Sequence, residues 1–192
     1  PYTAMRVGGP ADLLVVCESV DQVIETVALA RKHKVDWLLL GGGCNVLVAD
    51  KGVRGLVIVN KATRIAFEGN TARAEAGALL AQLARQAVER GLAGLEWASG
   101  LPGAVGGAVV GNAGAFDGDV ASVLRSATVL EPDGEAHQTH TVFRSFPALS
   151  RGRLPDADGL WTDTDEANVG MVWRDSPGSC MRINECKDVG DR

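Results

Sequence analysis

A glycine-rich segment at residues 99–115 restricts the fold of this chain more than any other feature. It contains six glycines, at positions 100, 103, 106, 107, 111 and 114, among mostly small or aliphatic residues. An ordinary core helix or strand does not tolerate so many glycines, and a surface loop would carry more polar side chains. Such a segment can instead bring bare backbone N–H groups against a large, flat or anionic ligand. A glycine-rich packing loop is the alternative that the sequence leaves open.

A second glycine run, Gly41-Gly42-Gly43, directly follows the apolar residues 37–40 and precedes Cys44 and Asn45. A strand that ends in several glycines exposes consecutive N–H donors, which suits a diphosphate group. A plain tight turn is the alternative. The run lacks the Gly-x-Gly-x-x-Gly order of a Rossmann loop and the Gly-Lys-Ser/Thr of a P-loop. Two such backbone cradles in one small domain predict a bound dinucleotide.

Composition narrows the classes of partner. The 192 residues carry a net charge of −5 without any basic block, which argues against a nucleic-acid partner. No apolar stretch reaches the roughly 18 residues of a membrane span, so we expect no membrane partner. The cysteines lack metal-ligand spacing, and His137 and His140 lie on a strand that is expected to be exposed, so we expect no metal. Cys17, in an apolar run, is expected to be a reduced thiol, as in the cytoplasm.

Hydrophobic periodicity predicts an α+β pattern. Strands are expected at 13–17 (buried), 37–40 and 55–59, a hairpin at 65–68 with 71–76, and a strand at 123–131 that returns at 135–142.

Two helices are expected between these strands. The first begins at a capping box formed by Ser19 and Gln22, with an apolar face that includes Val23, Val27 and Ala28. The second begins at Leu80 and ends before Gly91, which is expected at the C′ position.

Four segments occur in one order along residues 3–135. They read Thr3-Ala4-Met5-Arg6-Val7-Gly8-Gly9-Pro10-Ala11, then Gly41-Gly42-Gly43-Cys44-Asn45-Val46-Leu47-Val48, then Gly91-Leu92-Ala93-Gly94-Leu95-Glu96 with Ser99-Gly100-Leu101-Pro102-Gly103-Ala104-Val105-Gly106-Gly107-Ala108, then Asn112-Ala113-Gly114-Ala115. Together they resemble the UDP-N-acetylenolpyruvoylglucosamine reductase family. The resemblance implies the two-subdomain FAD-binding fold of the vanillyl-alcohol oxidase and p-cresol methylhydroxylase type.

The resemblance also implies a chemistry and a cofactor site. The family uses non-covalent FAD, with NADPH as hydride donor, to reduce a UDP-sugar enolpyruvyl ether to UDP-N-acetylmuramate in bacterial, cytoplasmic peptidoglycan synthesis. The residues implied to bind FAD are Gly41, Gly42, Gly43, Cys44, Asn45, Val46, Leu47, Ser99, Gly100, Pro102, Gly103, Gly106, Gly107, Asn112, Ala113 and Gly114. Cys44 replaces the family's usual Ser, and a thiol is the weaker hydrogen-bonding group. For Asn112, a hydrogen bond to a heteroaromatic ring and a turn-capping role are equally open.

Catalytic residues are carried over from two family motifs. Ser179, in residues 176–182, matches the serine that gives a proton to the substrate carbon, and Arg144 matches the arginine that stabilises the enolate. Residues 173–176 compete with Arg144 for the second role, and the family's late Glu has no counterpart here. A turn serine in a loose tail is the plain alternative for Ser179.

The resemblance also divides the chain. We expect an FAD-binding domain at residues 1–150, with subdomains at about 1–60 and 61–150. Residues 151–192, which are acidic and weakly periodic, are expected to be a divergent remnant of the substrate domain. Two further functions stay open: an oxidase of the wider flavin family, and an FAD-binding module that lacks catalysis.

Overall fold

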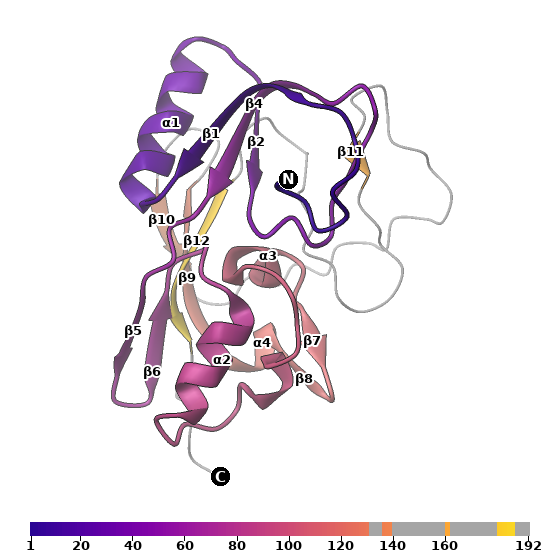
Figure 1. Cartoon of the computed structure of the whole chain (residues 1–192). Helices are drawn as coiled ribbons and strands as arrows, with labels where there is room; N and C mark the ends of the chain where they lie inside the picture. The colour runs from indigo at the N-terminus through magenta and orange to yellow at the C-terminus, as the bar shows by residue number, and fades with distance from the viewer. Residues whose placement is uncertain (131–135, 140–159, 162–179, 187–192) are drawn as a thin grey trace.

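The computed structural model describes residues 1–130, 136–139, 160–161 and 180–186 (Figure 1). Nothing is described for residues 131–135, 140–159, 162–179 and 187–192, so the expected turn at 133–134 lies outside the described residues. None of the described helices is long and apolar enough to cross a membrane.

A three-stranded parallel sheet occupies the N-terminal part of the chain. Its order is β1 (Ala11–Cys17), β4 (Val53–Asn60) and β2 (Trp37–Leu40), with β4 in the centre. Ile58 of β4 pairs with Val15 on one side and Leu39 on the other. The helix α1 (Val20–Lys32) links β1 to β2 and packs on one face of the sheet (Figure 1). This strand–helix–strand unit confirms the prediction from periodicity.

The two faces of this sheet carry separate apolar clusters. Val23 and Val27 of α1 pack with Cys17 and Ile58 on one face, and Leu130 joins them from the second part of the chain. On the other face, Leu40, Val57 and Val59 pack with Val46, which lies just before β3 (Leu47–Val48). The loop that follows β2 is therefore fixed to the sheet by Val46.

The expectation that residues 13–17 form a buried strand is only partly correct. Cys17 is buried, but Leu13 is 56% exposed and Leu14 is 43% exposed. The reason is that β1 is an edge strand, paired with β4 alone. On α1, Ala30 is buried and Ala28 is exposed, so the apolar face turns away from Ala28.

Both helix ends predicted from sequence occur in the structure. The Ser19 hydroxyl accepts a hydrogen bond from the Gln22 backbone N–H at 3.2 Å, and the Gln22 side chain accepts one from the backbone N–H of Glu18 at 2.7 Å. The helix α2 (Leu80–Val88) ends in a Schellman motif. The Gly91 N–H donates to the Val88 carbonyl oxygen, and the Leu92 N–H donates to the Ala87 carbonyl oxygen. Gly91 has φ +73°, as a C′ glycine requires.

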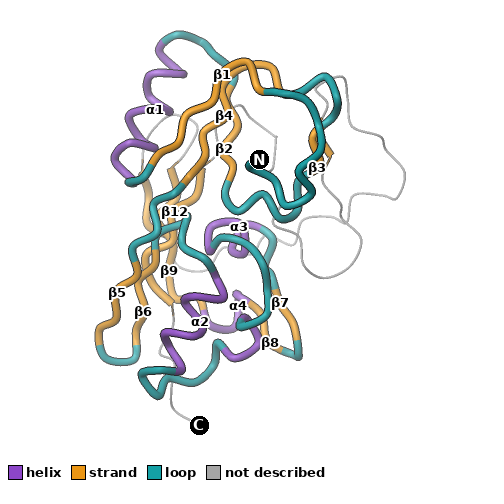
Figure 2. Tube along the Cα trace, in the orientation of Figure 1, coloured by secondary structure: helices purple, strands orange, loops and turns teal. Residues whose placement is uncertain are grey.

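The second part of the chain is built around α2 and a hairpin. The strands β5 (Ile65–Glu68) and β6 (Thr71–Ala74) pair antiparallel, as predicted. Alanine and leucine side chains from β6 and α2 form its core with Trp97 of the short helix η1 (Glu96–Ala98) and with Val105 of α3 (Val105–Val110). Figure 2 shows α2, α3 and α4 (Val120–Val123) close to one another below the first sheet.

A second antiparallel sheet has the order β10 (Ala136–Thr139), β9 (Leu124–Leu130) and β12 (Cys180–Cys186). The predicted pairing of β9 with its return strand β10 is confirmed. Two segments beyond residue 150 also pair with earlier strands, because β12 lies beside β9 and β11 (Leu160–Trp161) lies beside β3. These parts of the expected remnant belong to the sheets of the fold.

Candidate functional site

The two glycine segments meet in space. The loop at residues 41–45 follows β2, and α3 lies just beyond it (Figure 1). A Cβ placed on Gly41 would lie 3.2 Å from the Cβ of Ala104, and one on Gly42 would lie 3.2 Å from Gly103 Cα. The contacting residues of the two segments lie more than 60 positions apart in the sequence, so the fold itself brings these two predicted loops together.

The loop at 41–45 contains two backbone donors without a described partner. Within the described part of the chain, no group accepts a hydrogen bond from the backbone N–H of Gly42 or Gly43. Gly43 has φ +62°, and a side chain there would collide with the backbone of Tyr2. Consecutive free amides on a strand-to-loop turn form the kind of nest that binds phosphate oxygens.

Residues 1–10 lie along residues 43–52 and are called the N-terminal strap here. The Ala4 N–H donates to the Gly43 carbonyl oxygen at 2.9 Å, and the Gly9 N–H donates to the Ala49 carbonyl oxygen at 2.8 Å. A Cβ on Gly8 would overlap the carbonyl oxygen of Val48. The Arg-Val-Gly-Gly-Pro motif thus packs its backbone closely against residues 48–50, just after the second glycine segment. Neither segment alone carries a sequence signal for this contact.

Three glycines of the first segment face open space. No described atom lies within 4 Å of a Cβ built on Gly100, Gly103 or Gly107. Gly103 has φ +128°, a conformation that side chains rarely adopt. A side chain at any of these positions would fill space beside the backbone, which is how a glycine cradle admits a large flat ligand. The predicted cofactor site therefore has the bare surface that FAD needs.

Gly106 differs from these three. It is buried, its N–H donates to the Ala76 carbonyl oxygen at 2.8 Å, and a Cβ on it would lie 2.8 Å from the Cβ of Ala76. The neighbouring Val105 N–H donates to the Ala78 carbonyl oxygen at 2.8 Å. Both amides are therefore used inside the protein. Gly106 therefore has the packing role that was the alternative for this segment, and its implied contact with FAD stays a prediction.

Asn112 has a turn-capping role. It adopts φ +44°, its Oδ1 accepts from the Ala121 N–H at 2.8 Å, and its Nδ2 donates to Asp119 Oδ2 at 3.1 Å. Asp119 is in turn the N-cap of α4, accepting from the Ser122 N–H at 2.9 Å. The side chain thus holds the start of α4. Its predicted hydrogen bond to a ring stays a prediction.

The strands β7 (Gly114–Ala115) and β8 (Gly118–Asp119) form a hairpin, and the hydrogen bond between the Asn112 and Asp119 side chains joins its two ends. The Ala113 carbonyl oxygen accepts from the Val120 N–H at 3.0 Å, and a Cβ on Gly118 would overlap the Trp97 ring. Phe116, at the tip, is 93% exposed with φ +50°. Ala113 and Gly114 thus stand on a rigid base.

The other residues predicted to bind the cofactor differ in how far their side chains are exposed. Val46 is buried in the first sheet's core, so only its backbone is available to a ligand. The exposed Cys44 thiol makes a local contact of 3.6 Å with the Gly42 carbonyl oxygen. Pro102, Ser99 and Leu47 are exposed, and Asn45 is half-buried with a partner of its own. The two predicted catalytic residues, Ser179 and Arg144, lie outside the described residues.

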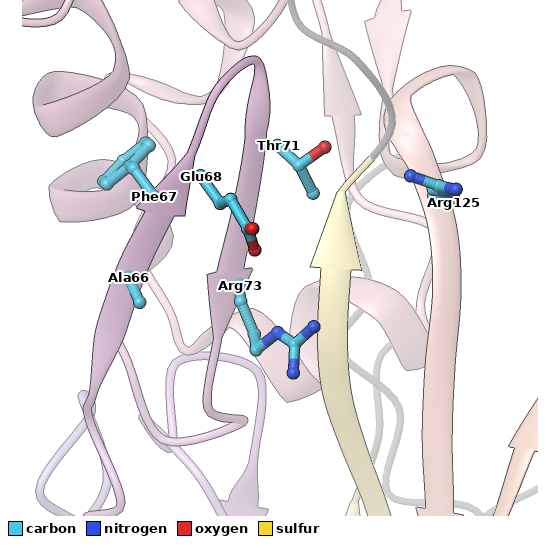
Figure 3. A pocket seen from close by; sticks show the side chains of 6 residues that line it. All are labelled: Ala66, Phe67, Glu68, Thr71, Arg73 and Arg125. Atoms are coloured by element: carbon cyan, nitrogen blue, oxygen red, sulfur yellow. The ribbon is translucent and has the colours of Figure 1, made fainter.

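A hollow of about 390 Å³ lies elsewhere, on the outer side of the hairpin β5–β6. Ala66, Phe67, Glu68, Thr71, Arg73 and Arg125 line it. In Figure 3, Glu68 and Arg73 come from the hairpin and Arg125 comes from β9, with β12 between them. None of the predicted site residues that the structure describes lines this hollow. Among the described residues there is also no cluster of His, Cys, Asp or Glu that could hold a metal ion.

Comparison with known proteins agrees with this geometry. Residues 11–140 match the family described as FAD binding domain. The chain is 44% identical over 131 residues to a UDP-N-acetylenolpyruvoylglucosamine reductase of Clostridium botulinum, a match that covers 68% of this chain and 43% of that protein. It is 48% identical over 127 residues to the reductase of that name from Clostridium perfringens, covering 66% of this chain and 42% of that protein. The chain thus spans less than half the length of these relatives.

Solved structures show the same fold. A crystal structure of UDP-N-acetylenolpyruvylglucosamine reductase from Thermus caldophilus aligns with a TM-score of 0.63 and 27% identity, covering 97% of this chain and 57% of that one. The 6-hydroxy-D-nicotine oxidase of Arthrobacter nicotinovorans aligns with a TM-score of 0.56 and 19% identity, covering 70% of this chain and 31% of that one. The predicted α+β fold, shared by this reductase and flavin-type oxidases, is confirmed.

Proposed function

Because this chain belongs to the FAD binding domain family, which it matches over residues 11–140, we propose that it binds FAD against its two glycine segments, beside the point where they meet. We further propose that it is the flavin-binding part of a UDP-N-acetylenolpyruvoylglucosamine reductase. The observation that carries the proposal is the contact of Gly41 and Gly42 with residues 103–104 beside the open surface at Gly103 and Gly107. The names and identities of the Clostridium relatives support the choice of reductase.

In this proposal, the two glycine segments bind different parts of FAD. The amides of Gly42 and Gly43 bind the diphosphate, because they are consecutive donors on a turn fixed by Val46 and the N-terminal strap. Gly100, Gly103 and Gly107 let the rest of the cofactor lie against backbone. When bound, FAD supplies the transfer of a hydride from NADPH to the double bond of a UDP-sugar enolpyruvyl ether.

Two further residues complete the proposed chemistry. The Ser179 hydroxyl gives a proton to the substrate carbon that does not receive the hydride, and the Arg144 guanidinium stabilises the negative charge of the enolate. Both roles come from the resemblance of their sequence motifs. The domain division at residue 150, the cytoplasmic location and the place in peptidoglycan synthesis rest on the same resemblance.

A flavin titration tests the binding part of the proposal. The purified protein, stripped of any bound flavin, is mixed with FAD, and flavin fluorescence and absorbance are followed. A saturable spectral change with one FAD per chain is expected. A protein that ignores added FAD would refute the proposal.

Activity is tested separately. NADPH oxidation that requires the enolpyruvyl substrate, and that Ser179→Ala removes without loss of FAD binding, is the expected result. Steady oxidation of NADPH without that substrate would contradict the reductase assignment, and steady peroxide production from an alcohol or a sugar would indicate the oxidase instead.

A further inference from the structure

The proposed diphosphate site has no cation within either glycine segment. Residues 35–50 and 91–124 contain neither Lys nor Arg, although they contain several Asp and Glu residues. Backbone amides offer only partial charges to an anion. A cation that faces the phosphates must therefore come from another part of the chain that the fold brings to the loop at 41–45.

The N-terminal strap carries such a cation next to this loop. It is bonded to the loop through Ala4, whose N–H donates to the Gly43 carbonyl oxygen at 2.9 Å, and beyond β3 through Gly9, whose N–H donates to the Ala49 carbonyl oxygen at 2.8 Å. Arg6 is the cation of this strap and is exposed. The two bonds hold the Arg6 backbone beside the rim of the glycine loop.

The Arg6 backbone has an uncommon conformation. Its φ is +53°, in the left-handed region that residues other than glycine seldom adopt, and its N–H closes a turn onto the Thr3 carbonyl oxygen at 3.2 Å. Strained residues of this kind cluster at ligand sites. With the described residues, the Arg6 guanidinium forms neither a hydrogen bond nor an ion pair.

We propose that Arg6 is a cofactor-binding residue whose guanidinium contacts the FAD diphosphate beside the amides of Gly42 and Gly43. A guanidinium presents paired N–H donors that match the oxygen spacing of a phosphate group. The strap would thus act as both a structural support for the loop and its source of positive charge. This inference rests on the proposed function, since it assumes that FAD occupies the glycine site.

The test compares FAD affinity among single variants of the full chain. Arg6→Gln removes the charge, and Arg6→Lys keeps it. Lys34→Gln is the matched control, because Lys34 is also an exposed cation with a left-handed backbone, φ +55°, but follows α1 outside both glycine segments. FAD binding is measured by fluorescence at low and at high NaCl, and thermal unfolding of the apo proteins shows whether each variant is folded.

Arg6→Gln should weaken FAD binding by about three- to tenfold, as expected for the loss of one charge-assisted contact. Its affinity should also depend less on salt than that of the unmodified protein, because a screened charge pair is gone. Arg6→Lys should retain most of the affinity, and Lys34→Gln all of it.

Equal affinity and equal salt dependence for Arg6→Gln and the unmodified protein would overturn the assignment of Arg6 alone. An equal loss in Lys34→Gln would overturn it too, because a general charge effect would then explain both results. If the unmodified protein binds no FAD, the proposed function fails and this inference fails with it.

Discussion

Gly106 donates its backbone N–H to the Ala76 carbonyl oxygen at 2.8 Å, and a Cβ on Gly106 would lie 2.8 Å from the Cβ of Ala76. This pair joins α3 to the segment between β6 and α2. Close backbone contact leaves no room for a methyl group at position 106. The same helix exposes its next residue, Gly107, to open space.

The first prediction is that Gly106→Ala destabilises the fold. Overpacking a filled contact costs about 1–3 kcal/mol, and the better helix propensity of Ala recovers only about 0.5–1 kcal/mol of it. We expect the free energy of unfolding of the apo protein to fall by about 1–2 kcal/mol in urea titrations. An unchanged urea midpoint would mean that α3 can move away from Ala76 without cost.

The second prediction concerns Gly107, the residue after Gly106 in α3. Gly107→Ala should raise the free energy of unfolding of the apo protein by about 0.5–1 kcal/mol, because the new methyl group meets no described atom and Ala suits a helix better than Gly. The same methyl group should weaken FAD binding about fivefold or more, since it fills the cradle. A more stable variant with undiminished FAD affinity would place the cofactor elsewhere.

The third prediction tests the link between Asn112 and Asp119. Asn112→Ala removes the bonds to Ala121 and Asp119 and leaves a left-handed alanine, so it should cost about 2 kcal/mol of stability. Asn112→Gly should cost less, because glycine adopts this φ without strain. Urea titration of both variants measures the difference. Equal losses in the two variants would show that strain at this position contributes nothing.

Local features of the fold could be predicted from the sequence because local contacts determine them. Ser19 caps α1 within one turn of chain, and α2 ends through bonds of Gly91 and Leu92 to residues three and five positions before them. The details still differ, since the Gln22 side chain accepts from Glu18 and not from Ser19. Hydrogen bonds of this range need no knowledge of the tertiary fold.

Features that depend on distant segments could not be predicted. Leu13 is exposed because β1 is an edge strand. The hydrophobic periodicity of one strand does not predict the order of the strands in a sheet. The pairing of β12 with β9 joins residues at least 50 positions apart.

The candidate site shows the same limit. Gly106 and Gly107 are adjacent and identical in type, yet one packs on Ala76 and the other faces open space. The high glycine content therefore predicts a bare backbone surface in this segment. Whether a given glycine packs against the protein or faces open space depends on its neighbours in the folded structure. The contact of the strap with Gly43 also links segments some 40 residues apart, with no signal in either one alone.

The fourth prediction concerns the tip of the hairpin β7–β8. Phe116 and Asp117 have φ values of +50° and +62°, the sign that a tight two-residue hairpin turn requires at both central positions. Asn-Gly adopts this turn with little strain, whereas a bulky residue such as Phe does not. The double variant Phe116→Asn with Asp117→Gly should therefore raise the free energy of unfolding by about 1 kcal/mol in urea titrations.

Phe116→Tyr, which keeps the strain, should leave the stability unchanged. Because Phe116 is 93% exposed, no packing is lost in the exchange, so a less stable double variant would show that the left-handed turn is not the preferred conformation of this hairpin.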